Sequence, residues 1–214
     1  MNDIVRLQNI RLFPLVVTAV SLVQPAYAKG APAPTRQSLT PAVMKYLRAR
    51  GNFCMAKYDW PIDVGPADRA ARSRDSLQLP VLESLGVVSS SPLPDDPTVT
   101  RYQLTEKGRQ SYLARKIPAK GPQGEPIEHS GDFCPVRLSL DRVVSWESTG
   151  TGEQTQLSVK YTYKIEHAAE WAADPAARQV FPMMARLMDG AGKMELAQAF
   201  RWSGRAWEAL PPGG

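Results

Sequence analysis

Residues 156–166, QLSVKYTYKIE, alternate strictly between apolar and polar side chains. Every second residue, from Leu157 through Tyr161 to Ile165, is apolar, and the residues between them are polar or charged. Successive side chains of a β-strand point to opposite faces, so this pattern is typical of a strand with one buried and one solvated face. It predicts an antiparallel sheet in this part of the chain.

Neighbouring segments supply partners for this strand. Residues 133–146 place several apolar side chains on one face, and residues 193–202 and 205–210 form a predicted hairpin around Ser203 and Gly204. Residues 168–188 are helical in pieces, because Pro175 and Pro182 interrupt them. We therefore predict an α+β unit over residues 133–210, an antiparallel sheet whose apolar face is covered by the short helices of 168–188.

The first half of the chain has a different order of elements. We predict a helix from Thr40 to Gly51, an extended aromatic segment over 52–64 and a helix over 68–85. Two short strands, 87–90 and 99–104, flank the proline-rich tip SPLPDDPT (91–98), and a short helix follows at 105–113. This order defines a second predicted unit over residues 39–116.

Two short stretches of this unit carry a family resemblance. Residues 82–113, which include LGVV at 85–88 and YQLTEKGR at 102–109, resemble the wing region of winged-helix proteins. The resemblance implies a winged-helix-like fold in which the helix over 68–85 is the recognition helix, with Arg69, Arg72 and Arg74 at its start. In a DNA-binding relative such arginines would contact phosphates, but winged-helix domains also dock other proteins, and we expect that role here.

Between the two units lies IPAKGPQGEPIEHSGD, residues 117–132. Three prolines and three glycines among polar residues predict an irregular linker. His129, with Ser130, Asp132 and Cys134 nearby, can also be interpreted as a metal or nucleophile site. The composition favours the linker.

The chain begins with features of a secretory signal. Arg6 and Arg11 precede an apolar run that ends at Val23, and small residues stand at Ala26 and Ala28. A basic start, an apolar centre and a small-x-small ending are the three parts of a signal peptide, here residues 1–28. The apolar run is shorter than the ~20 residues that span a bilayer, so we expect cleavage and no membrane span afterwards. A flexible lead-in over residues 29–38 would follow.

Charge and cysteine content fit a periplasmic or secreted protein. Removal of the predicted signal lowers the formal net charge from +5 to +4, and the remaining charges are interspersed. No basic stripe for nucleic acid is present. Cys54 and Cys134 are the two cysteines of the chain, and in an oxidising compartment an even pair usually forms a disulfide. Free thiols or a redox couple are the alternatives, the latter poorly supported because C-x-x-C is absent.

Candidate binding residues lie in the first unit. Tyr58 and Trp60 belong to an aromatic segment, and together with Arg69, Arg72 and Arg74 they form the predicted binding surface. A place at the edge of the core is the favoured alternative for the two aromatic residues. Three methionines, Met183, Met184 and Met188, are either an adaptable docking surface or core, with core favoured.

No complete motif for catalysis, a metal or a cofactor appears, so we predict none of these. The leading hypothesis is an exported, non-enzymatic protein that binds another protein or a cell-envelope component. One alternative is a cell-wall hydrolase with a dispersed carboxylate site, for which Asp59, Asp63 and Glu147 are candidates because they lie near aromatic residues. Another is an immunity-type protein that neutralises a toxin.

Overall fold

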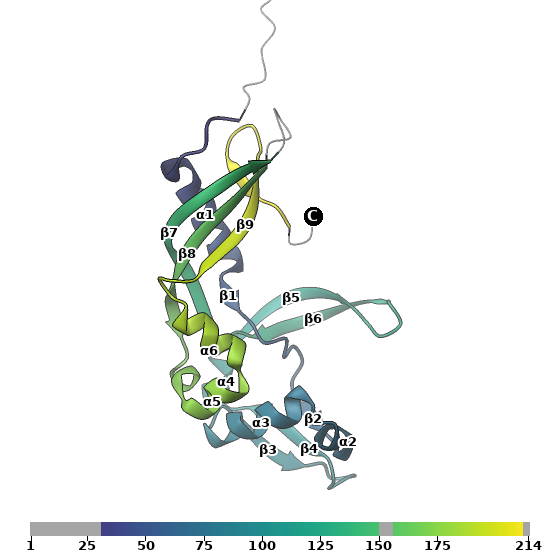
Figure 1. Ribbon diagram of the computed structural model, residues 1–214. Helices are drawn as coiled ribbons and strands as arrows, with labels where there is room; N and C mark the ends of the chain where they lie inside the picture. Colours follow the sequence, from purple (N-terminus) through teal and green to yellow (C-terminus); the bar gives the residue numbers. More distant parts are fainter. Residues whose placement is uncertain (1–30, 150–155, 212–214) are drawn as a thin grey trace, which may run out of the picture.

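The computed structural model describes residues 31–149 and 156–211. The predicted signal, with Ala26 and Ala28, lies outside these residues. The molecule is long and narrow, with a curved sheet at one end, a small sheet at the other and a hairpin arm that projects between them (Figure 1). The predicted α+β class with an antiparallel sheet is confirmed.

The elements follow one another along the chain from Arg36 to Ala209. The helices are α1 (Arg36–Arg50), α2 (Pro66–Ala70), α3 (Arg74–Ser84), α4 (Glu106–Arg109), the 3-10 helix η2 (Glu170–Ala173), α5 (Pro175–Val180) and α6 (Pro182–Asp189). The strands are β1 (Asn52–Phe53), β2 (Ile62–Val64), β3 (Val88–Pro92), β4 (Thr100–Leu104), β5 (Tyr112–Lys120), β6 (Pro126–Phe133), β7 (Val136–Thr149), β8 (Gln156–Ala168), β9 (Glu195–Trp202) and β10 (Trp207–Ala209).

The large sheet has the order β1-β7-β8-β9-β10, and each pair is antiparallel. Leu157, Val159, Tyr161 and Tyr163 of β8 are all at most 2% exposed, so the predicted buried face is confirmed. Thr162 on the other face is also buried, and its hydroxyl has a partner there, because it donates to Asp141 at 2.7 Å.

Helix α1 is the main helical cover of this sheet. Its buried residues Leu39, Val43 and Leu47 face the strands, and α1 contacts both β7 and β10. Two strands separate β7 from β10 in the sheet, so the sheet must curve around the helix (Figure 1). The prediction from the sequence was instead that the short helices of residues 168–188 cover this face of the sheet. Of these, α5 packs on α3, and α6 reaches the sheet where Tyr163 donates to the Leu187 carbonyl at 2.7 Å.

The start of α1 differs from the prediction. The helix begins at Arg36 rather than near Thr40, so the last residues of the predicted flexible lead-in are helical. Thr35 and Ser38 form a capping box, with Ser38 N donating to Thr35 Oγ1 at 3.1 Å and Thr35 N donating to Ser38 Oγ at 3.0 Å. This box satisfies free backbone donors one turn before Pro41, which explains the earlier start.

The small sheet has the order β2-β4-β3 and carries α2 and α3. The strands β2, β3 and β4 lie within or close to their predicted ranges, but the single helix predicted over 68–85 is two helices, α2 and α3. The break between them holds Arg72, whose φ of 51° is not helical, so the predicted recognition helix is not one continuous helix. Helix α1, the predicted first helix of the same unit, packs on the large sheet instead. A winged-helix-like unit over residues 39–116 is therefore not confirmed.

The predicted irregular linker over residues 117–132 is wrong. This segment forms most of the hairpin β5–β6, which pairs from Tyr112↔Phe133 to Lys120↔Pro126 (Figure 1). Gly124 has a φ of 85° in the connecting turn, a conformation that favours glycine. Prolines are tolerated because both strands are edges, where a missing N–H need not break a ladder. The proline and glycine content of residues 117–132 does not by itself distinguish an irregular linker from a hairpin of two edge strands.

One hydrophobic cluster joins residues of both predicted units. Leu79 and Val88 belong to the same buried set as Val136 and Phe200. Gly51 provides a close contact between α1 and β7, because a Cβ there would lie 2.4 Å from the Leu47 carbonyl oxygen and 2.6 Å from that of Leu138. Among the helices of the described residues, none has the length and apolar character needed to cross a membrane.

Candidate functional site

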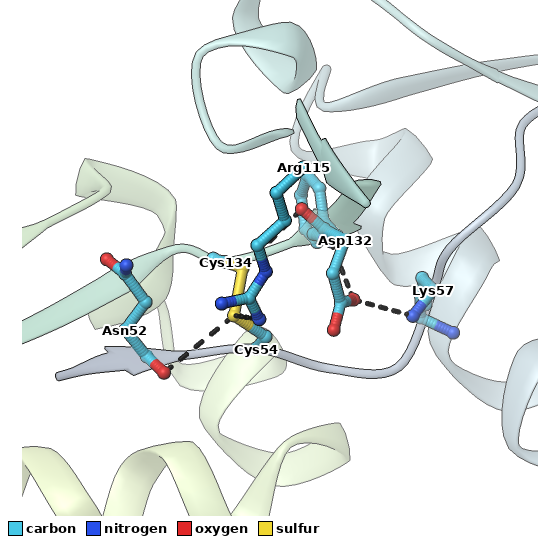
Figure 2. The surroundings of a disulfide bond; sticks show 7 residues. Asn52, Cys54, Lys57, Arg115, Asp132 and Cys134 are labelled. Atoms are coloured by element: carbon cyan, nitrogen blue, oxygen red, sulfur yellow. Dashed lines mark hydrogen bonds between the residues drawn. A yellow bond between two sulfur atoms is a disulfide. The ribbon is translucent and has the colours of Figure 1, made fainter. Parts of the chain in front are cut away.

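The predicted disulfide between Cys54 and Cys134 is present and spans 80 residues of sequence. It ties the segment after β1 to the residue that follows β6, at the base of the hairpin arm (Figure 2). Arg115 Nη2 lies 3.6 Å from Cys54 Sγ. Asp132 lies beside the two sulfurs. One of its carboxylate oxygens and the sulfurs of Cys54 and Cys134 all lie within 4.8 Å of one another, as the ligands of a metal ion would. Because metals bind thiolates and these sulfurs are bonded to each other, the trio is no ligand set in this form.

A buried cation lies next to the disulfide. The Lys57 side chain is 1% exposed and pairs with Asp75 at the start of α3. Asp132 Oδ1 accepts the backbone N–H of Lys57 at 3.0 Å and that of Phe133 at 2.7 Å. Burial lowers the pKa of Lys57 and Arg74 lowers it further, whereas the hydrogen bond and charge of Asp75 oppose the shift. These contacts join the hairpin base to α3.

The aromatic segment is held against the hairpin. The rings of Tyr58 and His129 stack with centroids 4.2 Å apart, and Asp59 Oδ2 lies 2.6 Å from His129 Nδ1. His129 therefore pairs with Asp59 and not with Asp132, because residues three apart in a strand point to opposite faces. Trp60 is half-buried and meets Phe133 edge to face at 6.1 Å, a position at the border of the core.

The three predicted arginines do not form one surface. Arg69 donates to the Val64 carbonyl at 2.9 Å and also to that of Thr98, so it holds the small sheet together. Arg72 is exposed, with a φ of 51° between α2 and α3. Arg74 lines a groove on the side of the molecule where α3 meets α5 and α6. Only Arg74 joins a candidate binding site in the structure.

This groove, which we call the Met183 groove, has a volume of about 480 Å³. It is lined by the segment at the disulfide, by α3 and by the junction of α5 and α6: Phe53, Cys54, Met55, Ala56, Arg74, Gln78, Val180, Phe181, Pro182, Met183 and Met184. Most of these residues are apolar, as is usual for ligand pockets, and Arg74 is the only charged one.

Several contacts make the groove a fixed feature. Gln78 Nε2 donates to the Val180 carbonyl at 3.0 Å and so ties α3 to the end of α5. Phe181 meets Trp171 edge to face with centroids 6.0 Å apart. Met184 is fully buried, whereas Met183 is 65% exposed. The prediction of core is therefore confirmed for Met184 and wrong for Met183.

The three candidate carboxylates lie in separate surroundings. Asp59 contacts His129, Asp63 accepts two hydrogen bonds from Arg101, and Glu147 pairs with Lys160 at 3.4 Å. Arg101 lowers the pKa of Asp63 through these hydrogen bonds. None of the three contacts another of them through a hydrogen bond among the described residues.

Sequence reasoning missed the Met183 groove and the buried Lys57. Arg74 and Met183 are far apart in the chain, and only the packing of α3 on α5 brings them together. The three methionines of residues 183–188 were the one feature of the sequence that pointed to a docking surface here. In comparisons with known proteins, no family model, curated protein or solved structure gave a significant match to this chain.

Proposed function

We propose that this protein is an exported, non-enzymatic interaction protein that docks a segment of another protein in the Met183 groove. Support for export comes from the signal-like features of residues 1–28 and from the disulfide, which is stable in an oxidising compartment. The single observation that carries the docking proposal is the exposed Met183 at an apolar groove with one cation.

The apolar part of the groove favours an apolar anchor on the partner. Met183 is 65% exposed, so a partner that covers its apolar side chain removes that surface from water, which is favourable, and the flexible side chain adapts its shape to the incoming group. The buried Met184 and the Phe181–Trp171 contact give the groove a firm base. An anchor that fills such a pocket typically carries much of the binding free energy.

The charge of the groove favours an acidic group beside that anchor. Arg74 makes no ion pair or side-chain hydrogen bond within residues 31–149 and 156–211, whereas the neighbouring Lys57 is already paired with Asp75. A guanidinium offers five donors to a carboxylate, so a free one at the rim selects negative partners. The partner segment therefore combines a large apolar side chain with an adjacent carboxylate.

Two peptide probes test this proposal in a fluorescence anisotropy titration. Each contains a leucine and a phenylalanine, flanked by aspartates in one probe and by lysines in the other. We expect the acidic probe to bind the mature, oxidised protein and the basic probe to bind at least about tenfold more weakly, a difference of about 1.4 kcal/mol.

Variants of the groove complete the test. Met183→Gln should weaken binding of the acidic probe by at least about tenfold, because it replaces the apolar side chain without adding a charge, and Arg74→Glu should transfer the preference to the basic probe. Met44→Gln is the matched control, because Met44 is 44% exposed on α1 and does not line this groove. Equal binding of both probes, or loss of binding in the control, would contradict the proposal.

A further inference from the structure

A second pocket, separate from the Met183 groove, lies at the base of the hairpin arm. Its volume is about 380 Å³, and three parts of the chain line it: residues 59–61, the end of the small sheet with α4, and the hairpin. We call it the hairpin-base pocket. The residues that matter for its chemistry are Asp59, Trp60, Gln103, Arg109 and Tyr112.

Tyr112 presents a fixed aromatic ring in this pocket. Its hydroxyl donates to the Tyr58 carbonyl at 2.8 Å and lies 3.3 Å from Ser130 Oγ. A Cβ added at Gly131 would lie 2.5 to 2.7 Å from atoms of the Tyr112 side chain, so only glycine lets the ring lie against β6. The ring is therefore positioned before any ligand arrives, which reduces the entropy cost of binding.

Polar groups of three kinds surround the two aromatic residues. One carboxylate oxygen of Asp59 is held by His129, and the other makes no hydrogen bond to a described residue. The Gln103 amide likewise makes no side-chain hydrogen bond within residues 31–149 and 156–211. Arg109 Nη1 donates a hydrogen bond to Glu106 Oε2 at 3.0 Å, and the other donors of this guanidinium make no hydrogen bond to a described residue. The pocket thus offers acceptors, donors and an amide that supplies both.

We propose that the hairpin-base pocket binds an uncharged pyranose sugar. A pyranose ring has an apolar face of C–H groups, which packs on an aromatic ring, and hydroxyls that both donate and accept hydrogen bonds. Trp60 and Tyr112 match the first property, and Asp59, Gln103 and Arg109 match the second. The lining of the pocket carries one carboxylate, Asp59, and one guanidinium, Arg109, so neither sign of charge dominates it, which favours an uncharged ligand.

Titration of the isotope-labelled mature protein with triacetylchitotriose, an uncharged trisaccharide, tests this inference by NMR. We expect saturable shifts of the Trp60 indole and Gln103 side-chain signals, with glycerol as a polyol that lacks the ring face. At about 10 mM sugar, a site with a Kd of about 1 mM is about nine-tenths occupied. Absence of saturable shifts at this concentration, or equal shifts with glycerol, would overturn the proposal.

Exposed positions allow variants that keep the fold. Gln103→Ala and Arg109→Ala should each weaken sugar binding by at least about fivefold, through loss of one hydrogen-bonding group. Gln110→Ala is the matched control, because Gln110 is exposed beside Arg109 and does not line the pocket. Unchanged binding in the first two variants would also overturn the proposal. Met183→Gln should leave the sugar response intact, so failure of one proposal is distinguishable from failure of the other.

Discussion

The large sheet and the region around the disulfide are stabilised by different means. The sheet has long paired strands, and residues such as Tyr163 and Phe200 are fully buried within it. The disulfide region, residues 52–64 with the hairpin base, has short strands and is tied by a covalent bond, a buried lysine and a stacked histidine. A sheet with a buried face is stabilised by many similar contacts between neighbouring strands, whereas an irregular junction depends on a few specific contacts.

The largest expected effect comes from removing the disulfide. Replacing both Cys54 and Cys134 by alanine should lower the free energy of unfolding by about 4 kcal/mol, because the unfolded chain loses a constraint over a long loop. Denaturant unfolding measures this loss. Hydrogen exchange should accelerate more in β2, β4 and the hairpin base than in β8 and β9. Uniform acceleration would show that the two regions unfold as one unit.

The ion pair of Lys57 should show an asymmetry between its partners. Asp75→Asn should cost about 2 kcal/mol, more than Lys57→Met, because it leaves a buried ammonium group without its carboxylate. Denaturant unfolding of the two variants at neutral pH compares these costs. A larger loss in Lys57→Met would show that the lysine stem, and not its charge, stabilises the junction.

The cost of Asp75→Asn should also depend on pH. The pKa of Lys57 is lowered in the folded protein from an ordinary value of 10.5. Between the lowered pKa and 10.5 the unfolded chain therefore binds more protons at this residue, and the stability contribution of Lys57 rises with pH. We expect the cost of Asp75→Asn to be smaller at about pH 10 than at about pH 7. A cost independent of pH would contradict this assignment.

The smallest expected effect concerns the junction of the sheet with α6. Tyr163→Phe removes the hydrogen bond to the Leu187 carbonyl and should cost about 1 kcal/mol, without disturbing the strand pairing. Thermal or denaturant unfolding measures the cost, and exchange in α6 should accelerate more than exchange in β8. A loss spread over the whole sheet would show that the hydroxyl supports the strands themselves.

Much of the large sheet is predictable from local pattern, and little of the candidate sites is. The alternation in residues 156–166 was enough to identify the buried face of β8, because the side-chain period of a strand is fixed by backbone geometry. The hairpin β5–β6 was missed because glycine and proline are frequent in both linkers and edge strands. Met183 and Arg74 gave no local sign that they share a groove.

The sequence by itself determined the α+β class, the buried face of the central strand and, by cysteine count, the disulfide pairing. Tertiary structure alone decided that α1 covers the sheet, that Lys57 is buried and that His129 pairs with Asp59. The alternation of apolar residues and the number of cysteines can be read from the sequence whatever the tertiary arrangement of the chain. Which apolar face meets which, and which charges become neighbours, depends on packing between residues far apart in sequence, for which a single sequence carries no local signal.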